Sequence, residues 1–157
     1  MSTPETTIST DPDVPIIRIT REFAASPAQV FRAHVEPELI VQWLGPKDLE
    51  MTIDRWDCRT GGEYRYVHRR DDMEAGFHGC FHDVRPNERI VQTFTWEGAP
   101  DGVSLETLEL EDLGDGRTRL SIRSLVESFT IRDMILASGM EHGVVEGYEK
   151  LDALLAR

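Results

Sequence analysis

The stretch TIRDMILASGMEHGVVEGYEKLDALLAR, residues 130–157, decides the fold. Its apolar side chains recur every three or four residues, which predicts one long helix over about 130–156 with an apolar face. The residues of this face are Met140, Val144, Tyr148, Leu151 and Leu155. Gly139, Gly143 and Gly147 lie along one stripe of that helix. Since each glycine costs about 1 kcal/mol relative to alanine, either another backbone approaches the stripe closely or space is left open beside it.

The region between this helix and residue 47 is typical of β-strands. Alternating patterns and turn residues predict strands at about 48–56, 62–69, 76–84, 89–97, 103–112 and 117–126, in addition to 14–23 near the N-terminus. Glycine-rich, proline-led and Asp-Gly turns separate the six later strands. Adjacent hairpins of this kind imply an antiparallel meander.

Two short helices are expected between the first strand and the meander, over about 26–44. Ser26, Pro27 and Gln29 form a capping box with proline at the first helical position, and Gly45-Pro46 ends the segment. At the C-terminal end of the chain, Thr130 and Asp133 resemble a second capping box. The element order predicts an α+β fold, with a curved antiparallel sheet of about seven strands wrapped around the long C-terminal helix. The space between them is expected to be a pocket.

Composition predicts one domain over residues 14–157, after a disordered tail at 1–13 that is rich in Ser, Thr, Pro and Asp. The tail lacks the features of a signal peptide, and no apolar run is long enough to cross a membrane. A net charge of −12 opposes nucleic-acid binding and attachment to anionic membranes. Two cysteines without a CxxC motif favour a reduced, cytoplasmic protein. Because no nucleotide-binding or hydrolase motif is present, no cofactor is expected.

Three polar residues fall in phase with inward apolar positions of the predicted strands: Arg21, His68 and Glu106. Arg21 and Glu106 could meet as a buried pair or address a polar ligand group, or a bulge could turn either of them to solvent. His68 shares a strand face with Tyr64 and Tyr66, where a structural histidine is more common than a catalytic one. These three are the weak catalytic candidates.

His78, Cys80 and His82 alternate along one strand and have the chemistry of zinc ligands. Three such side chains along one strand span about 13 Å, which is too far for one ion. Phe77 and Phe81 suit the inward face, so the metal-ligand types are expected to point outward and no metal site is predicted. The orientation of Trp96 depends on whether a bulge interrupts the preceding hairpin.

Several short motifs resemble the activator of heat-shock protein 90 ATPase homologue family of the START-like helix-grip superfamily. They include Trp43-Leu44-Gly45-Pro46, the run DCRTGGEY at 57–64, and HGCF at 78–81 followed by PNERIV at 86–91. The resemblance covers roughly residues 16–155. It implies a helix-grip fold with a hydrophobic cavity, small-molecule binding in standalone members, and no shared catalytic triad.

We therefore expect a protein that holds a small hydrophobic or amphipathic molecule between the sheet and the C-terminal helix. The expected ligand-binding residues are Trp43, Tyr64, Tyr66, His68, Phe77, Phe81, Glu106, Met140 and Val144. For Trp43, core packing is the alternative to a place at the pocket mouth. A cyclase- or lyase-like enzyme using polar cavity residues is the alternative function. A third is a partner-binding module related to the heat-shock ATPase activators, although no segment matches the additional chaperone-gripping domain of the eukaryotic co-chaperones.

Overall fold

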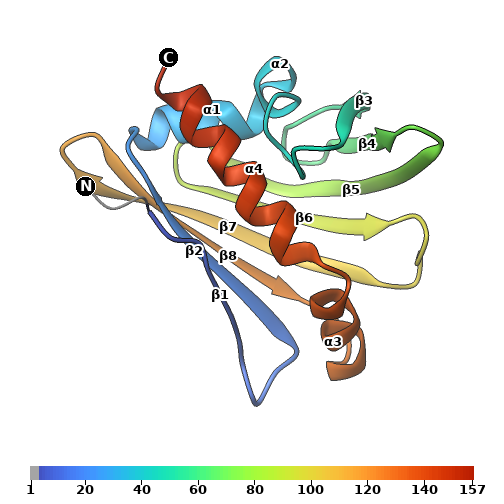
Figure 1. Cartoon of the computed structure of the whole chain (residues 1–157). Helices are drawn as coiled ribbons and strands as arrows, with labels where there is room; N and C mark the ends of the chain where they lie inside the picture. The colour runs from blue at the N-terminus through green and yellow to red at the C-terminus, as the bar shows by residue number, and fades with distance from the viewer. Residues whose placement is uncertain (1–3) are drawn as a thin grey trace.

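A single eight-stranded antiparallel sheet is the framework of the computed structural model, which describes residues 4–157 (Figure 1). The strands are β1 (Thr7–Thr10), β2 (Ile16–Phe23), β3 (Glu50–Trp56), β4 (Glu63–Arg70), β5 (Met73–Arg85), β6 (Arg89–Trp96), β7 (Val103–Gly114) and β8 (Arg117–Leu125). They lie in the order β1-β2-β8-β7-β6-β5-β4-β3. The strands from β3 to β8 thus form the predicted meander, and β2 pairs with β8 at its end.

The helices cover one face of this sheet (Figure 1). They are α1 (Pro27–Val35), α2 (Pro37–Ile40), α3 (Phe129–Ala137) and α4 (Met140–Leu155). Helix α4 crosses the sheet from the end that carries α3 to the end that carries α1 and α2. We call the sheet face turned toward α4 the concave face and the opposite one the convex face. The predicted α+β helix-grip architecture is confirmed.

The start of α1 follows the predicted capping box. The Ser26 hydroxyl accepts from the Gln29 amide at 3.3 Å, and the Gln29 side chain accepts from the Ser26 amide at 2.9 Å. At the far end of this helical segment, Gly45 has a φ of 100°, and a side chain there would also collide with the imidazole of His68. Glycine is therefore required at this position by both backbone and packing.

The C-terminal helix is broken, which corrects the prediction of one helix over 130–156. Gly139 has a φ of 87° and separates α3 from α4, so this glycine breaks the helical segment instead of belonging to a stripe. Helix α3 also begins earlier than predicted. Its cap is Ser128, whose hydroxyl accepts from the Ile131 amide at 3.1 Å, and not Thr130.

The two remaining glycines of the stripe face the chain segment after α2. A Cβ on Gly147 would lie 3.1 Å from the carbonyl oxygen of Trp43 and 3.3 Å from the amide nitrogen of Gly45. A Cβ on Gly143 would lie 3.4 Å from Cδ of Pro46. At Gly147 the structure therefore shows close approach of another backbone, whereas the neighbour of Gly143 is a proline side chain.

The N-terminal segment contains a strand that the sequence did not predict. Residues 7–10, placed by composition in a disordered tail, form β1 and pair antiparallel with β2, with Thr7 opposite Thr20 and Thr10 opposite Ile17. This strand makes the sheet eight-stranded rather than seven-stranded. The expected disorder of residues 1–3 lies outside the described residues.

A β-bulge between Phe81 and Asp83 settles the orientation of Trp96. An uninterrupted hairpin would set Trp96 opposite His78 on the convex face. The bulge shifts the register, so that Trp96 lies opposite Phe77 on the concave face, where its side chain is 50% exposed.

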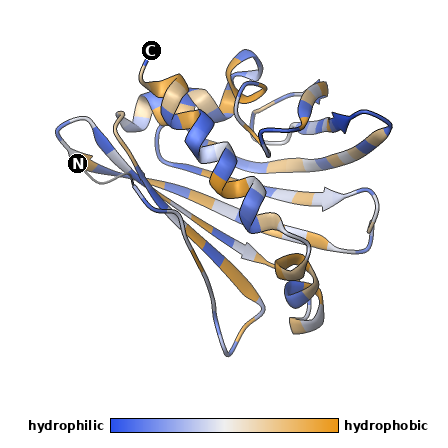
Figure 2. Ribbon diagram, viewed as in Figure 1, coloured by the Kyte–Doolittle hydropathy of each residue, from blue (hydrophilic) through white to orange (hydrophobic). Residues whose placement is uncertain are grey.

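The core lies between the concave face and the helices, in two neighbouring clusters. One gathers α1, α4, β2 and β8 around Phe23, Leu120 and Leu151. The other is aromatic and centres on Tyr64, Tyr66 and Phe81 of β4 and β5. Apolar and polar residues alternate along the strands (Figure 2), which is why one face can pack against the helices.

Candidate functional site

A row of polar side chains crosses the middle of the concave face. Gln92 of β6 lies opposite Glu106 of β7, which in turn lies opposite Ser124 of β8. We call these three residues the polar row. Because cross-strand partners share a face, the row points toward α4. Sequence phase indicated Glu106, but Gln92 and Ser124 were missed, although each is a polar residue at an inward position of its strand.

The apolar residues around the polar row are not sealed from solvent. They lie on the concave face or on the facing side of α4, pack at the edges of the two core clusters, and remain partly exposed. They are Phe77, Phe94, Leu108, Ile122, Met140 and Val144. By contrast, residues nearer α1, such as Leu120 and Phe81, are buried. The apolar side chains around the row are therefore only partly buried.

Glu106 is the carboxylic acid at the centre of this region. Its side chain is partly exposed, but most of it is enclosed by protein. This burial raises the pKa of Glu106 to about 7. The neighbouring Ser124 hydroxyl partly opposes the rise. No basic side chain in residues 4–157 forms an ion pair with Glu106 or contributes to its pKa shift. A carboxyl group of this kind can hold either charge state near neutral pH.

Three tyrosines lie near enough for the charge of Glu106 to affect them. Burial raises the pKa of Tyr64, Tyr66 and Tyr148, and the Glu106 carboxylate adds to each rise. The Tyr64 hydroxyl donates to the Thr93 carbonyl at 2.7 Å and accepts from the Gln92 amide at 3.2 Å. Within residues 4–157, the Tyr66 and Tyr148 hydroxyls have no hydrogen-bond partner. All three phenols stay neutral at physiological pH.

Arg21 does not pair with Glu106. Its side chain is 2% exposed and binds Asp152 of α4 through two hydrogen bonds, of 2.9 and 2.5 Å. It also donates to the Glu22 carbonyl at 2.8 Å, while its Nε is buried without a partner in the described chain. Arg21 therefore ties β2 to α4. The sequence could not identify this partner because the two residues are 131 positions apart.

A crevice of about 310 Å³ opens beside Arg21, between the N-terminal segment and α4. Its lining residues are Pro4, Glu5, Thr6, Arg21, Val145 and Glu149. Of the residues singled out from the sequence for the site, Arg21 alone borders it. The polar row does not contribute to this crevice.

His68 has the surroundings of a structural histidine. Its Nε2 lies 3.2 Å from the Leu44 carbonyl oxygen, and its ring packs against Tyr66 and Phe77. Burial lowers the pKa of His68, so the ring is neutral at physiological pH. Because a carbonyl oxygen can only accept, Nε2 carries the proton. His68 positions the segment after α2 and is not free to act as a base through that nitrogen.

Several expected ligand-binding residues are packed into the core. Trp43 is buried, donates from Nε1 to the Ala33 carbonyl at 2.9 Å, and stacks on Tyr148. Core packing is thus what the structure shows for Trp43, rather than a place at a pocket mouth. Tyr64 and Phe81 are similarly buried in the aromatic cluster. The accessible members of the expected set are Phe77, Glu106, Met140 and Val144.

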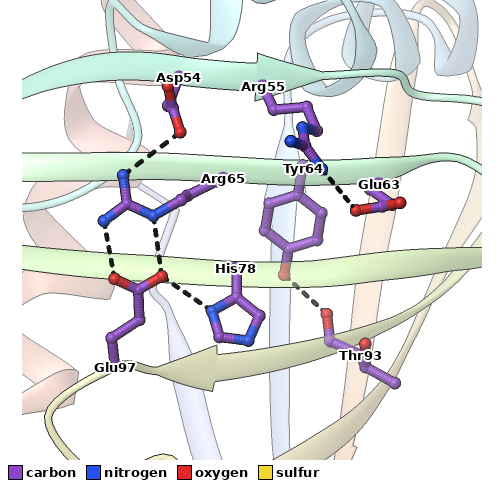
Figure 3. Close-up of polar contacts among 8 residues, drawn as sticks. All are labelled: Asp54, Arg55, Glu63, Tyr64, Arg65, His78, Thr93 and Glu97. Atoms are coloured by element: carbon purple, nitrogen blue, oxygen red, sulfur yellow. Dashed lines mark hydrogen bonds and ion pairs between the residues drawn. The ribbon is translucent and has the colours of Figure 1, made fainter.

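The convex face carries a separate ionic network (Figure 3). Arg65 donates from Nε and Nη2 to both carboxylate oxygens of Glu97 at 2.9 and 2.7 Å, and reaches Asp54 at 3.4 Å. His78 Nδ1 lies 2.9 Å from the same carboxylate. These contacts, the Arg65 hydrogen bond first, lower the pKa of Glu97 to about 2.

The three candidate metal ligands are exposed on this convex face, as expected: His78, Cys80 and His82. Among residues 4–157, no three His, Cys, Asp or Glu side chains are grouped to hold a metal ion. The convex network joins β3, β4, β5 and the residue after β6, on the opposite face of the sheet from the polar row. Its close internal pairing suits a structural role.

No helix within residues 4–157 has the length and hydropathy needed to cross a membrane.

No curated protein matches the chain. Solved structures, by contrast, match nearly the whole chain. A Rhodobacter sphaeroides protein is 28% identical with a TM-score of 0.86, over 96% of this chain and 97% of its own. An Arthrobacter aurescens protein is 26% identical with a TM-score of 0.86, over 96% and 91%.

A Silicibacter pomeroyi AHSA1 protein shares the fold, with 24% identity and a TM-score of 0.74 over 90% of this chain and 97% of its own. The family model described as activator of Hsp90 ATPase homolog 1-like protein matches residues 24–156. That range takes in α1, the whole meander and α4. The chain belongs to the activator of Hsp90 ATPase homolog 1-like family.

Proposed function

We propose that the protein binds a small, largely apolar molecule between the concave face and α4. The observation that carries the proposal is the partial exposure of apolar side chains around an unpaired acid in the middle of the fold. Ligand sites in proteins combine an apolar lining with a few placed polar groups. The polar row supplies such groups, and Leu108, Ile122 and Val144 supply apolar surface.

Binding of the uncharged fluorophore N-phenyl-1-naphthylamine tests this proposal. We expect its emission to shift to the blue on binding, and Leu108→Trp to weaken that binding at least about tenfold because the indole would occupy the proposed ligand position beside Glu106. Leu105→Trp is the matched control, since Leu105 lies on the same strand but is exposed on the convex face. Equal affinity in the two variants would place the dye elsewhere and refute the proposal.

An enzymatic function is the second candidate, and one observation favours it. A carboxyl group with a pKa of about 7 is suited to transfer protons at neutral pH. Of the three weak catalytic candidates, Arg21 is held by Asp152 and His68 by Leu44, which leaves Glu106 as the group able to act. In a substrate screen, a turnover that Glu106→Gln lowers by about two orders of magnitude or more would favour the enzyme.

A further inference from the structure

We propose that the ligand of the concave face is an organic cation, an amine on an apolar skeleton whose ammonium group pairs with Glu106. This inference rests on the proposed binding function and adds the class of ligand. Glu106 is a carboxyl group inside the fold whose row neighbours, Gln92 and Ser124, are both uncharged. A buried carboxylate without a counter-charge is costly, and a bound cation removes that cost.

The cationic side chains of this region are already engaged. Arg21 gives two hydrogen bonds to Asp152. Lys150 of α4 donates to the Pro46 carbonyl at 3.3 Å. Neither of them affects the pKa of Glu106. Within residues 4–157, the counter-charge for Glu106 is therefore missing, and a ligand can provide it.

Aromatic rings beside the polar row also suit a cation. Tyr66 stacks on Phe77 with centroids 5.2 Å apart, and Phe77 stacks on Phe94 at 5.4 Å. Tyr148 lies on α4, and the charge of Glu106 contributes to its raised pKa. Phe77 and Phe94 remain partly exposed, and an exposed aromatic face attracts ammonium groups. A carboxylate beside this aromatic surface therefore favours a cation over a neutral molecule of the same shape.

The net charge of the whole chain also favours a cation as the ligand. A net charge of −12 raises the local concentration of cations and disfavours anions. That effect is general, however, and salt screens it. The specific claim concerns Glu106, so the experiment must separate the two contributions.

Three probes share one apolar skeleton: 4-phenylbutylamine, 4-phenylbutan-1-ol and 4-phenylbutanoate. We expect calorimetric titration at pH 8 and 0.15 M salt to give an affinity at least about tenfold higher for the amine than for the alcohol, with the carboxylate weakest. Glu106→Gln should remove the preference for the amine over the alcohol. Glu109→Gln is the matched control, because it removes the same charge from the exposed face of β7.

The pH dependence gives a second readout. Between pH 6 and pH 8 the amine stays charged while Glu106 ionises, so its affinity should rise about tenfold. The affinity of the alcohol should stay flat. Among the other groups that face this region, burial raises the pKa of Tyr64, Tyr66 and Tyr148 and lowers that of His68, so each of them favours its neutral form. Arg21 is held by Asp152.

The outcomes separate the two proposals. If amine and alcohol bind equally, or if Glu109→Gln reduces the amine preference as much as Glu106→Gln does, the cation proposal is overturned and the binding site remains. If N-phenyl-1-naphthylamine binds but none of the three probes does, the cation proposal also fails. If neither the dye nor the probes bind, the proposed function itself fails.

Discussion

Arg21 shows how a single charged residue can hold two distant elements together. Its guanidinium is almost fully buried, whereas its partner Asp152 keeps 32% of its side chain exposed. Removing one member of such a pair leaves a buried charge without compensation, which is far more costly than losing an exposed pair. The stability of the β2–α4 contact therefore depends on the Asp152 carboxylate.

Asp152→Asn should lower the free energy of unfolding by about 2–3 kcal/mol, somewhat below the range for fully buried pairs because Asp152 is partly exposed. Glu63→Gln is the matched control, since Glu63 pairs with Arg55 at 2.8 Å on the surface and should cost less than about 1 kcal/mol. Urea unfolding of both variants measures the difference. Equal losses would show that Arg21 finds adequate solvation without Asp152.

At the scale of elements, α4 approaches the segment after α2 closely at one glycine and loosely at another. A Cβ added to Gly147 would have backbone atoms at 3.1 and 3.3 Å, whereas one added to Gly143 would have a proline side chain at 3.4 Å. Both have ordinary helical backbone geometry, so alanine fits each of them conformationally. The two sites therefore differ in packing alone.

Gly143→Ala should stabilise the protein by up to about 1 kcal/mol, through helix propensity. Gly147→Ala gains the same propensity but pushes the helix against backbone that cannot rotate away, so we expect it to be about 1–3 kcal/mol less stable than Gly143→Ala. Thermal unfolding of the two variants tests this ordering. A Gly147→Ala protein as stable as Gly143→Ala would mean that α4 shifts freely at this point.

The elements that could be predicted from sequence are those with strong local signals. The capping box at Ser26 and the Asp115-Gly116 turn each fix backbone geometry within a few residues, so α1 and the β7–β8 hairpin lie where predicted. Strand β1 was missed because TIST has too few apolar residues to alternate, and its pairing with β2 stabilises it. Gly139 was misread because a glycine at helical spacing looks the same whether it lies inside a helix or ends one.

The candidate site was only partly predictable for the same reason. Strand phase is local, so it placed Glu106 on the inward face. The choice between Glu106 and Asp152 as the partner of Arg21 depends on how α4 crosses the sheet, which no local pattern encodes. Likewise, the sequence cannot distinguish a packed aromatic residue such as Tyr64 from an accessible one such as Phe77, because both alternate in the same way.

At the scale of the whole molecule, burial shifts the pKa values of two groups, His34 and Glu106, in opposite directions. His34 of α1 is 9% exposed, donates from Nδ1 to the Val30 carbonyl at 2.7 Å, and has its Nε2 buried without a partner in residues 4–157. Burial lowers the pKa of His34 to about 4. Burial raises the pKa of Glu106 to about 7. Both groups prefer to be neutral in the folded protein.

The signs of the two effects follow from proton linkage. Between about pH 4 and 6.5 the unfolded chain protonates His34 more than the folded protein does, so this stability is full above pH 6.5 and is lost as the pH falls toward 4. Between about pH 4.5 and 7 the folded protein retains a proton on Glu106 that the unfolded chain loses, so this stability is lost as the pH rises. Each slope is at most about 1.4 kcal/mol per pH unit.

The two slopes oppose each other between about pH 4.5 and 6.5, so the free energy of unfolding of the unmodified protein should change little there. In Glu106→Gln, the free energy of unfolding should rise by about 2–3 kcal/mol as the pH increases from 4.5 to 6.5. His68, whose pKa is also lowered, adds to that rise. His34→Leu should instead tilt the profile downward with increasing pH. Denaturant unfolding at half-unit pH steps measures all three profiles, and parallel curves for the three proteins would show that neither group is buried as the structure places it.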